Sequence, residues 1–237
     1  MISNNRANSP TQASGVSHFR ERWSDPLLTA LTILLTFIIF VLAPLQAAGI
    51  TEAQDAGFAI AVIVIGAIVI LSERPSAIAL MVIGLGLAIT AAVLRLQTPS
   101  AFDVYLKAGA WLLTGLALIW VVTEAVFASG RITYHRIMGA ILLYLAIGWT
   151  FAGLFTLVGL LVPNAFAGLS VTDSPALASN VHYFSFGTLT TAGSGDIAPV
   201  HPIARSLVNI EAMVGQLYPA TLLARLVTLE IEGEANR

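Results

Sequence analysis

Residues 183–196 read Tyr183-Phe184-Ser185-Phe186-Gly187-Thr188-Leu189-Thr190-Thr191-Ala192-Gly193-Ser194-Gly195-Asp196. The first half is apolar and predicts a short helix with Ser179 or Asn180 as its N-cap, but about ten residues are too few to cross a bilayer. The second half carries glycines at alternate positions, which permit backbone conformations that other residues resist. In a membrane, such non-helical backbone is tolerated only where protein buries it or where it lines a water-filled cavity. For a membrane protein, this run therefore predicts a re-entrant helix that leads into a pore.

Long apolar segments flank this run. The chain has 237 residues, of which 57% are hydrophobic and only 10% charged, whereas a soluble domain carries about 25% charged residues. A helix of about 20 apolar residues can cross the hydrocarbon of a bilayer. We therefore predict an all-α membrane protein with six transmembrane helices and the re-entrant helix between the fifth and sixth. The six predicted spans are residues 26–51, 56–72, 75–94, 108–123, 137–162 and 206–224.

The basic residues predict the orientation, because cytoplasmic loops carry an excess of Lys and Arg. Six spans place eight of the eleven basic residues on one side, so we expect both termini to be cytoplasmic. The eight are Arg6, Arg20, Arg22, Arg74, Arg131, Arg136, Arg225 and Arg237, against Arg95, Lys107 and Arg205 on the other side. We divide the chain into a cytoplasmic tail (1–25), a four-span membrane domain (26–130) and a pore domain (131–237).

The four-span domain lacks the charges of a voltage sensor, which needs several Arg or Lys at every third position of its fourth span. Lys107 and Glu124 bracket that span and are expected only to reach the membrane interfaces. The chain has no cysteine, so neither disulfides nor a cysteine-based metal site is expected. We expect no cytoplasmic ligand-binding domain, since few residues follow Arg225.

Residues 183–196 resemble the pore helix and filter of potassium channels, whose pattern in this region is TTVGYGD. The likeness covers about residues 131–229, as in bacterial two-span ion-channel domains, and the first half of the chain shows no such likeness. It continues through Pro199, Arg205-Ser206-Leu207, Glu211-Ala212 and residues 214–218 into residues 224–227. The resemblance implies a four-fold homotetramer in the cell membrane of a bacterium, with the lipid bilayer and its own copies as partners. It implies no cofactor, no nucleic acid and no soluble partner.

The resemblance also implies roles for individual residues. Backbone carbonyls of four copies would line the axis and replace the hydration shell of a permeant cation. The selectivity filter would be Thr191, Ala192, Gly193, Ser194 and Gly195, flanked by Thr190 and Asp196, with K⁺ or Na⁺ bound at Thr191, Ala192 and Gly193. Tyr183, Phe184, Gly187 and Glu211 would lie behind the filter, and Gly215, Gln216 and Pro219 would form the gating hinge and the cavity.

Two residues depart from the family pattern, because Ala192 replaces Val and Ser194 replaces Tyr. Both are smaller, and Gly187 removes further volume behind the filter. Lost packing of this kind softens what remains. We therefore predict a cation channel that prefers K⁺ over Na⁺ only weakly, and a fully K⁺-selective channel is the alternative.

Other functions are weighed by their residues. A secondary transporter remains an alternative, although the two halves show no matched pair of interrupted helices. Ala192-Gly193-Ser194-Gly195 is close to the Gly-x-Ser-Gly pattern of intramembrane serine proteases, but after Ser194 only His201 could act as the general base. We therefore predict that the chain is not an enzyme. His182 and His201 are expected near the extracellular mouth, where a solvated histidine is commoner than a pH sensor.

Overall fold

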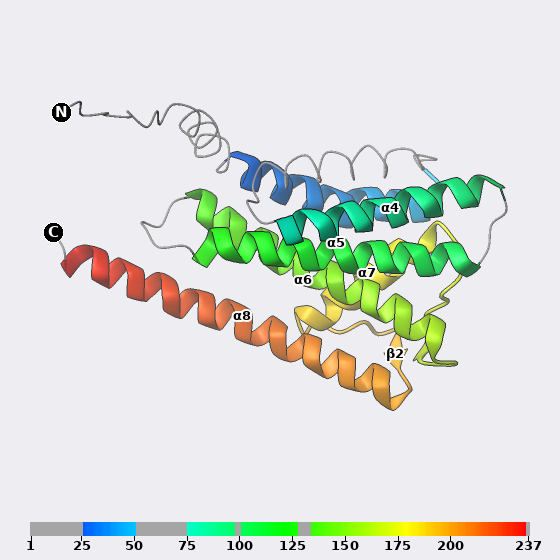
Figure 1. Ribbon diagram of the computed structural model, residues 1–237. Coiled ribbons are helices and arrows are strands. Elements are labelled where there is room, and N and C mark those ends of the chain that lie inside the picture. Colours follow the sequence, from blue (N-terminus) through cyan, green and yellow to red (C-terminus); the bar gives the residue numbers. More distant parts are fainter. Residues whose placement is uncertain (1–25, 51–74, 98–100, 128–133, 236–237) are drawn as a thin grey trace, which may run out of the picture.

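The computed structural model describes residues 26–50, 75–97, 101–127 and 134–235. This part of the chain is mostly helical, as predicted (Figure 1). Its elements are η1 (Ile38–Leu42), α2 (Ala43–Ala47), α4 (Pro75–Gln97), α5 (Ala101–Phe127), α6 (Tyr134–Leu161), β1 (Phe166–Ala167), α7 (Ala176–Leu189), β2 (Ala198–Pro199) and α8 (Pro202–Ala235). The exception to the all-α prediction is the antiparallel pair β1 and β2, with Phe166 opposite Pro199 and Ala167 opposite Ala198.

Four of the described helices are long and apolar enough to cross a membrane, namely Pro26–Ala47, Pro75–Leu94, Phe102–Glu124 and Ile137–Leu161. The predicted second span, 56–72, lies outside the described residues. The predicted sixth span, 206–224, lies within α8, which is long enough but is not one of the four. Polar side chains such as Asn209, Glu211 and Gln216 lower its hydropathy.

The first span contains a π-helical turn, η1, which ends two residues before Pro44. A proline inside a helix has no N–H to donate, and its ring collides with the carbonyl four residues earlier. The hydrogen-bond ladder widens here, and the N–H of Ala43 reaches the carbonyl of Ile38, five residues back. Pro44 thus accounts for the π-helical turn.

Helix α6 lies in the middle of the packed helices. Figure 1 shows α5 beside it on one side and α8 on the other, while α4 packs on α5. Small residues let α5 and α6 approach closely. A Cβ on Gly115 would lie 2.2 Å from Thr150 Oγ1, and one on Gly153 would lie 3.1 Å from Leu112 N. The first contact leaves no room for a side chain, and the second would require the backbone of α5 to shift slightly.

Helix α7 packs against three other elements, which are α2, α6 and α8. The ring of Phe40 in η1 meets the ring of Phe186 in α7 edge to face, with centroids 5.1 Å apart. A Cβ on Gly148 of α6 would lie 2.7 Å from the same Phe186 ring. The first span therefore supports α7 directly, and its neighbour α6 leaves room for the aromatic ring.

Candidate functional site

The short helix α7 begins earlier than predicted. Ser179 and Asn180, the predicted N-caps, lie inside it, and the cap position is held by Pro175 with φ of −58°. The ring of proline fixes φ near the helical value, which favours proline at the start of a helix. The N–H of Leu177 then donates to the carbonyl of Ser174 at 3.2 Å. With 14 residues, α7 is still too short to cross a membrane.

The predicted filter follows α7 without a break. The helix ends at Leu189 with Thr190 as its C-cap, and the N–H of Thr191 donates to the carbonyl of Thr188 at 2.9 Å. Thr191 and Gly193 have positive φ of 59° and 77°. A positive φ is unusual for a β-branched residue such as threonine, and backbone of this kind persists where the surrounding structure holds it, often at functional sites. Residues 190–193 are exposed in the single chain.

The filter backbone lies directly against α7 at Gly187. The N–H of Gly193 donates to the carbonyl of Gly187 at 2.9 Å, and a Cβ on Gly187 would lie 3.3 Å from Gly193 C and O. The space that the sequence predicted to be empty behind the filter is therefore occupied there by the filter strand itself. Ser194 also bonds within the loop, because its Oγ donates to the carbonyl of Ile197 at 3.1 Å.

The two aromatic residues predicted behind the filter point in different directions. Tyr183 is 50% exposed, whereas Phe184 is 2% exposed. The Phe184 ring contacts the rings of Phe155 in α6 and Phe166 in β1, at centroid distances of 4.8 and 5.4 Å. Consecutive residues of a helix lie about 100° apart around its axis, so the pair cannot share one face. Phe184 therefore joins α7 to α6 and to β1.

Glu211 is fully buried and contacts Ser185 of α7. Ser185 Oγ lies 2.5 Å from Glu211 Oε1 and 2.8 Å from the carbonyl oxygen of Gly148. A hydroxyl has one proton to donate, so Ser185 can serve only one of these two acceptors. If Ser185 donates to the carbonyl of Gly148, its contact with Glu211 is a hydrogen bond only when the Glu211 carboxyl carries a proton and donates it to Ser185 Oγ.

This contact joins α6, α7 and α8 at one point. No ion pair to Glu211 exists among the described residues, which agrees with a neutral carboxyl. The sequence analysis did not single out Ser185, although a serine inside the apolar run 181–189, together with a lone glutamate in the predicted sixth span, was a usable signal.

Gly215 and Gln216 of α8 meet the junction between α7 and the filter. A Cβ on Gly215 would lie only 1.8 Å from the carbonyl oxygen of Leu189, so the absence of a side chain allows the close approach. Tyr144 of α6 donates its hydroxyl to the same carbonyl at 3.2 Å. Gln216 Nε2 donates to Thr191 Oγ1 at 3.0 Å. These contacts hold α8 and α6 against the junction between α7 and the predicted filter.

Pro219 lies inside α8, which runs through it as one helix (Figure 1). The hinge at Gly215 and Pro219 stays a prediction, while Gly215 has a packing role that the sequence did not reveal. Close contact with a carbonyl 26 positions away leaves no local sequence signal.

The structure corrects the expectation of a solvated His182. This residue is 3% exposed, and its ring lies 5.5 Å from Trp111 and 4.9 Å from Trp149, between centroids. Its Nδ1 lies 2.6 Å from the carbonyl oxygen of Ala178. His182 is therefore part of the packing between α5, α6 and α7. His201 lies between β2 and α8, where its Nδ1 accepts a hydrogen bond from the N–H of Ile203 at 3.3 Å.

The structure also corrects the expectation for Lys107. The described helix α5 begins at Ala101, so Lys107 lies inside it instead of before it. Its Nζ forms an ion pair with Asp173 Oδ1 at 2.6 Å, and the two side chains are 25% and 11% exposed. Lys107 thus ties α5 to the loop that precedes α7.

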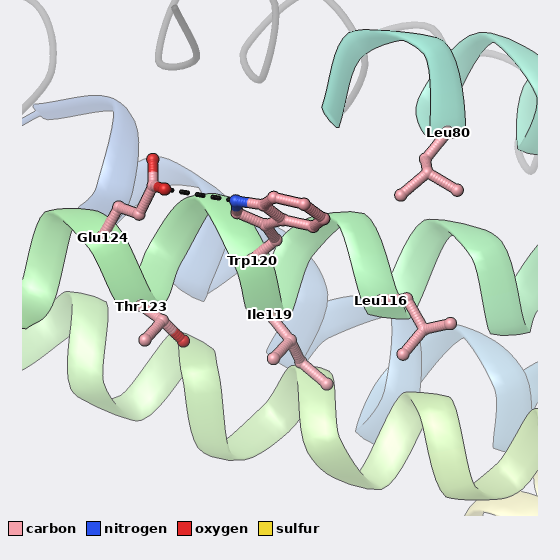
Figure 2. A pocket seen from close by; sticks show the side chains of 6 residues that line it. All are labelled: Leu80, Leu116, Ile119, Trp120, Thr123 and Glu124. Carbon is pink, nitrogen blue, oxygen red and sulfur yellow. Dashed lines mark hydrogen bonds between the residues drawn. The ribbon is translucent and has the colours of Figure 1, made fainter. Parts of the chain in front are cut away.

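A groove between α4 and α5 lies apart from these residues. Its lining is Leu80, Leu116, Ile119, Trp120, Thr123 and Glu124 (Figure 2). Trp120 Nε1 donates to Glu124 Oε1 at 3.2 Å along one wall. The lining is almost entirely apolar and includes none of the predicted filter residues. No group of three or more His, Cys, Asp or Glu side chains suited to a metal occurs in the described ranges.

Residues 140–231 match the model of a protein family described as an ion channel. The matched segment includes most of α6, all of α7, the predicted filter and most of α8. No curated protein matches the chain, and no solved structure matches it. With its apolar helices, the chain is a membrane protein, and the family of the matched segment is one of ion channels and not of enzymes.

Proposed function

We propose that four copies of the chain assemble around one axis into a channel that conducts K⁺, and also Na⁺, passively and with a weak preference for K⁺. The observation that carries the proposal is the non-helical stretch of residues 190–193, which is exposed in the single chain and follows α7 inside the segment that matches ion channels. One chain supplies one wall of a pore, and closed rotational symmetry is the usual way to complete it. The matching segment begins in α6, so α6 and α8 would be the outer and inner helices of each copy.

The partial charge at the C-terminal end of α7 favours the binding of cations over anions. The helix ends at Leu189, directly before the filter. The carbonyl end of a helix carries about half a negative charge, which favours a cation in front of it and disfavours an anion. Backbone carbonyls at Thr191, Ala192 and Gly193 would bind the dehydrated cation.

Weak selectivity follows from the outer half of the filter. Ser194, which stands in place of the tyrosine of the family pattern, makes its hydrogen bond within the loop, to the carbonyl of Ile197. The deeper positions, Thr191 and Gly193, are held by hydrogen bonds to α7. Fewer firmly held sites in series sort K⁺ from Na⁺ less well. A thousandfold preference corresponds to about 4 kcal/mol, and losing one or two sites removes much of it.

The proposal extends to the membrane topology. Six spans, with α8 as the last, place both termini in the cytoplasm and the chain in the inner or plasma membrane of a bacterium. The excess of basic residues on one side supports this orientation of the spans. The four-span domain would pack around the pore, as α2 does against α7.

Two measurements test the proposal. Native mass spectrometry of the purified protein should give four copies of the 25.0 kDa chain, and a monomer or dimer with an intact ion path would contradict it. In liposomes, Gly193→Ala should abolish K⁺ flux, because alanine resists the φ of 77° at this position. The matched control is Gly86→Ala, which meets no atom within 4 Å and should leave the flux unchanged.

A further inference from the structure

Gln216 makes the contact from which we argue. It lies on α8, and its Nε2 donates to Thr191 Oγ1, the side chain of the first filter residue. Thr191 Oγ1 also donates its own proton to the carbonyl of Thr190 at 2.7 Å. With that proton committed, the hydroxyl can only accept from Gln216. These hydrogen bonds therefore fix the orientation of the Gln216 amide. Its Nε2 faces Thr191, and its Oε1 points away from the Thr191 hydroxyl.

The oxygen of this amide, Gln216 Oε1, is available to bind a cation. No hydrogen bond to Gln216 Oε1 occurs among the described residues, and Gln216 is exposed in the single chain. An amide oxygen is a neutral, hard ligand of the kind that binds cations in proteins. Because Thr191 holds the nitrogen, the oxygen is positioned close to the filter.

The position of Gln216 depends on Gly215. The missing Cβ lets α8 approach the carbonyl of Leu189, and the next residue then reaches Thr191. A second polar contact, Tyr144 to Leu189, fixes the same junction from α6. The placement of the amide is therefore determined by three elements of the fold.

We propose that Gln216 is a specificity-determining residue whose Oε1, repeated in four copies, forms an additional site for monovalent cations at the α8 end of the filter. This inference rests on the proposed tetrameric channel. A cation that enters from this end would meet the Gln216 oxygens before Thr191. The hydrogen bond from Nε2 also occupies one lone pair of Thr191 Oγ1, which lowers the capacity of that hydroxyl to bind the ion.

The test uses the full-length protein in planar bilayers, with the K⁺ concentration at half-maximal current and block by Mg²⁺ as readouts. Gln216→Leu removes both the oxygen and the contact with Thr191. It should raise the K⁺ concentration at half-maximal current by about threefold or more. Gln216→Glu keeps the size of the side chain and adds a charge. It should strengthen Mg²⁺ block from one side by at least about tenfold.

The matched control is Thr221→Val on the same helix, because in the part of the chain that the structure describes the Thr221 hydroxyl lies within hydrogen-bond distance of carbonyls of its own helix alone, those of Leu217 and Tyr218. It should behave as the wild type. If both Gln216 variants keep wild-type half-saturation and wild-type Mg²⁺ block, the inference is wrong while the channel stands. If the wild type passes no cation current, the proposed function fails and takes the inference with it. Gln216→Glu decides the question even where Gln216→Leu does not assemble.

Discussion

Gly215→Ala tests how closely α8 packs against the end of α7, directly before the predicted filter. The new Cβ would lie 1.8 Å from the carbonyl oxygen of Leu189, whereas ordinary contact begins at 3.4 Å. The two elements must therefore separate by 1.6 Å. Overpacking of this kind costs about 1–3 kcal/mol, and the better helix propensity of alanine returns at most about 1 kcal/mol.

We expect a net loss of about 1–2 kcal/mol, which for a chain of this size lowers Tm by about 2–8 °C. The assay is thermal unfolding of the full-length protein in detergent, at one protein concentration, since assembly makes Tm depend on concentration. Gly86→Ala is the control, because its Cβ meets nothing within 4 Å and its Tm should stay or rise. The separation should also break the contact between Gln216 and Thr191. A Gly215→Ala protein as stable as the Gly86→Ala protein would refute the close packing.

Three further changes test other parts of the site. Glu211→Gln should keep the contact with Ser185 and stay within about 1 kcal/mol of the wild type, whereas Glu211→Ala should lose about 2–3 kcal/mol. Infrared spectra should show a protonated carboxyl band that disappears in both variants, and its absence from the wild type would contradict the neutral Glu211. Ala192→Val with Ser194→Tyr should shift the K⁺/Na⁺ reversal potential toward that of K⁺, and an unchanged value would count against the filter argument. Pro219→Leu should alter open probability more than ion selectivity in single-channel records, because a proline kink acts on the helix and not on the filter.

The sequence predicted the elements whose signals are local. Apolar runs predicted the helices, and the glycines after Leu189 predicted the irregular strand that follows α7. The ion-channel resemblance agrees with the match of residues 140–231. Each of these depends on residues close together in the chain.

Contacts between distant residues could not be predicted. The burial of His182 depends on Trp111 and Trp149, which come from other helices. Lys107 and Asp173 are 66 positions apart, and a single sequence does not show which charges will pair. The early start of α7 was missed for a different reason, since the favoured cap residues Ser179 and Asn180 competed with the fixed φ of Pro175.

The most direct test of the central claim, that the chain forms a cation channel, is the reversal potential of the purified protein in planar bilayers. A KCl gradient separates cations from anions, and a K⁺/Na⁺ gradient then measures the preference between the two cations. We predict a reversal near the K⁺ equilibrium potential in the KCl gradient and a value well short of it in the K⁺/Na⁺ gradient. Reversal at the Cl⁻ potential, or no current at all, would contradict the claim.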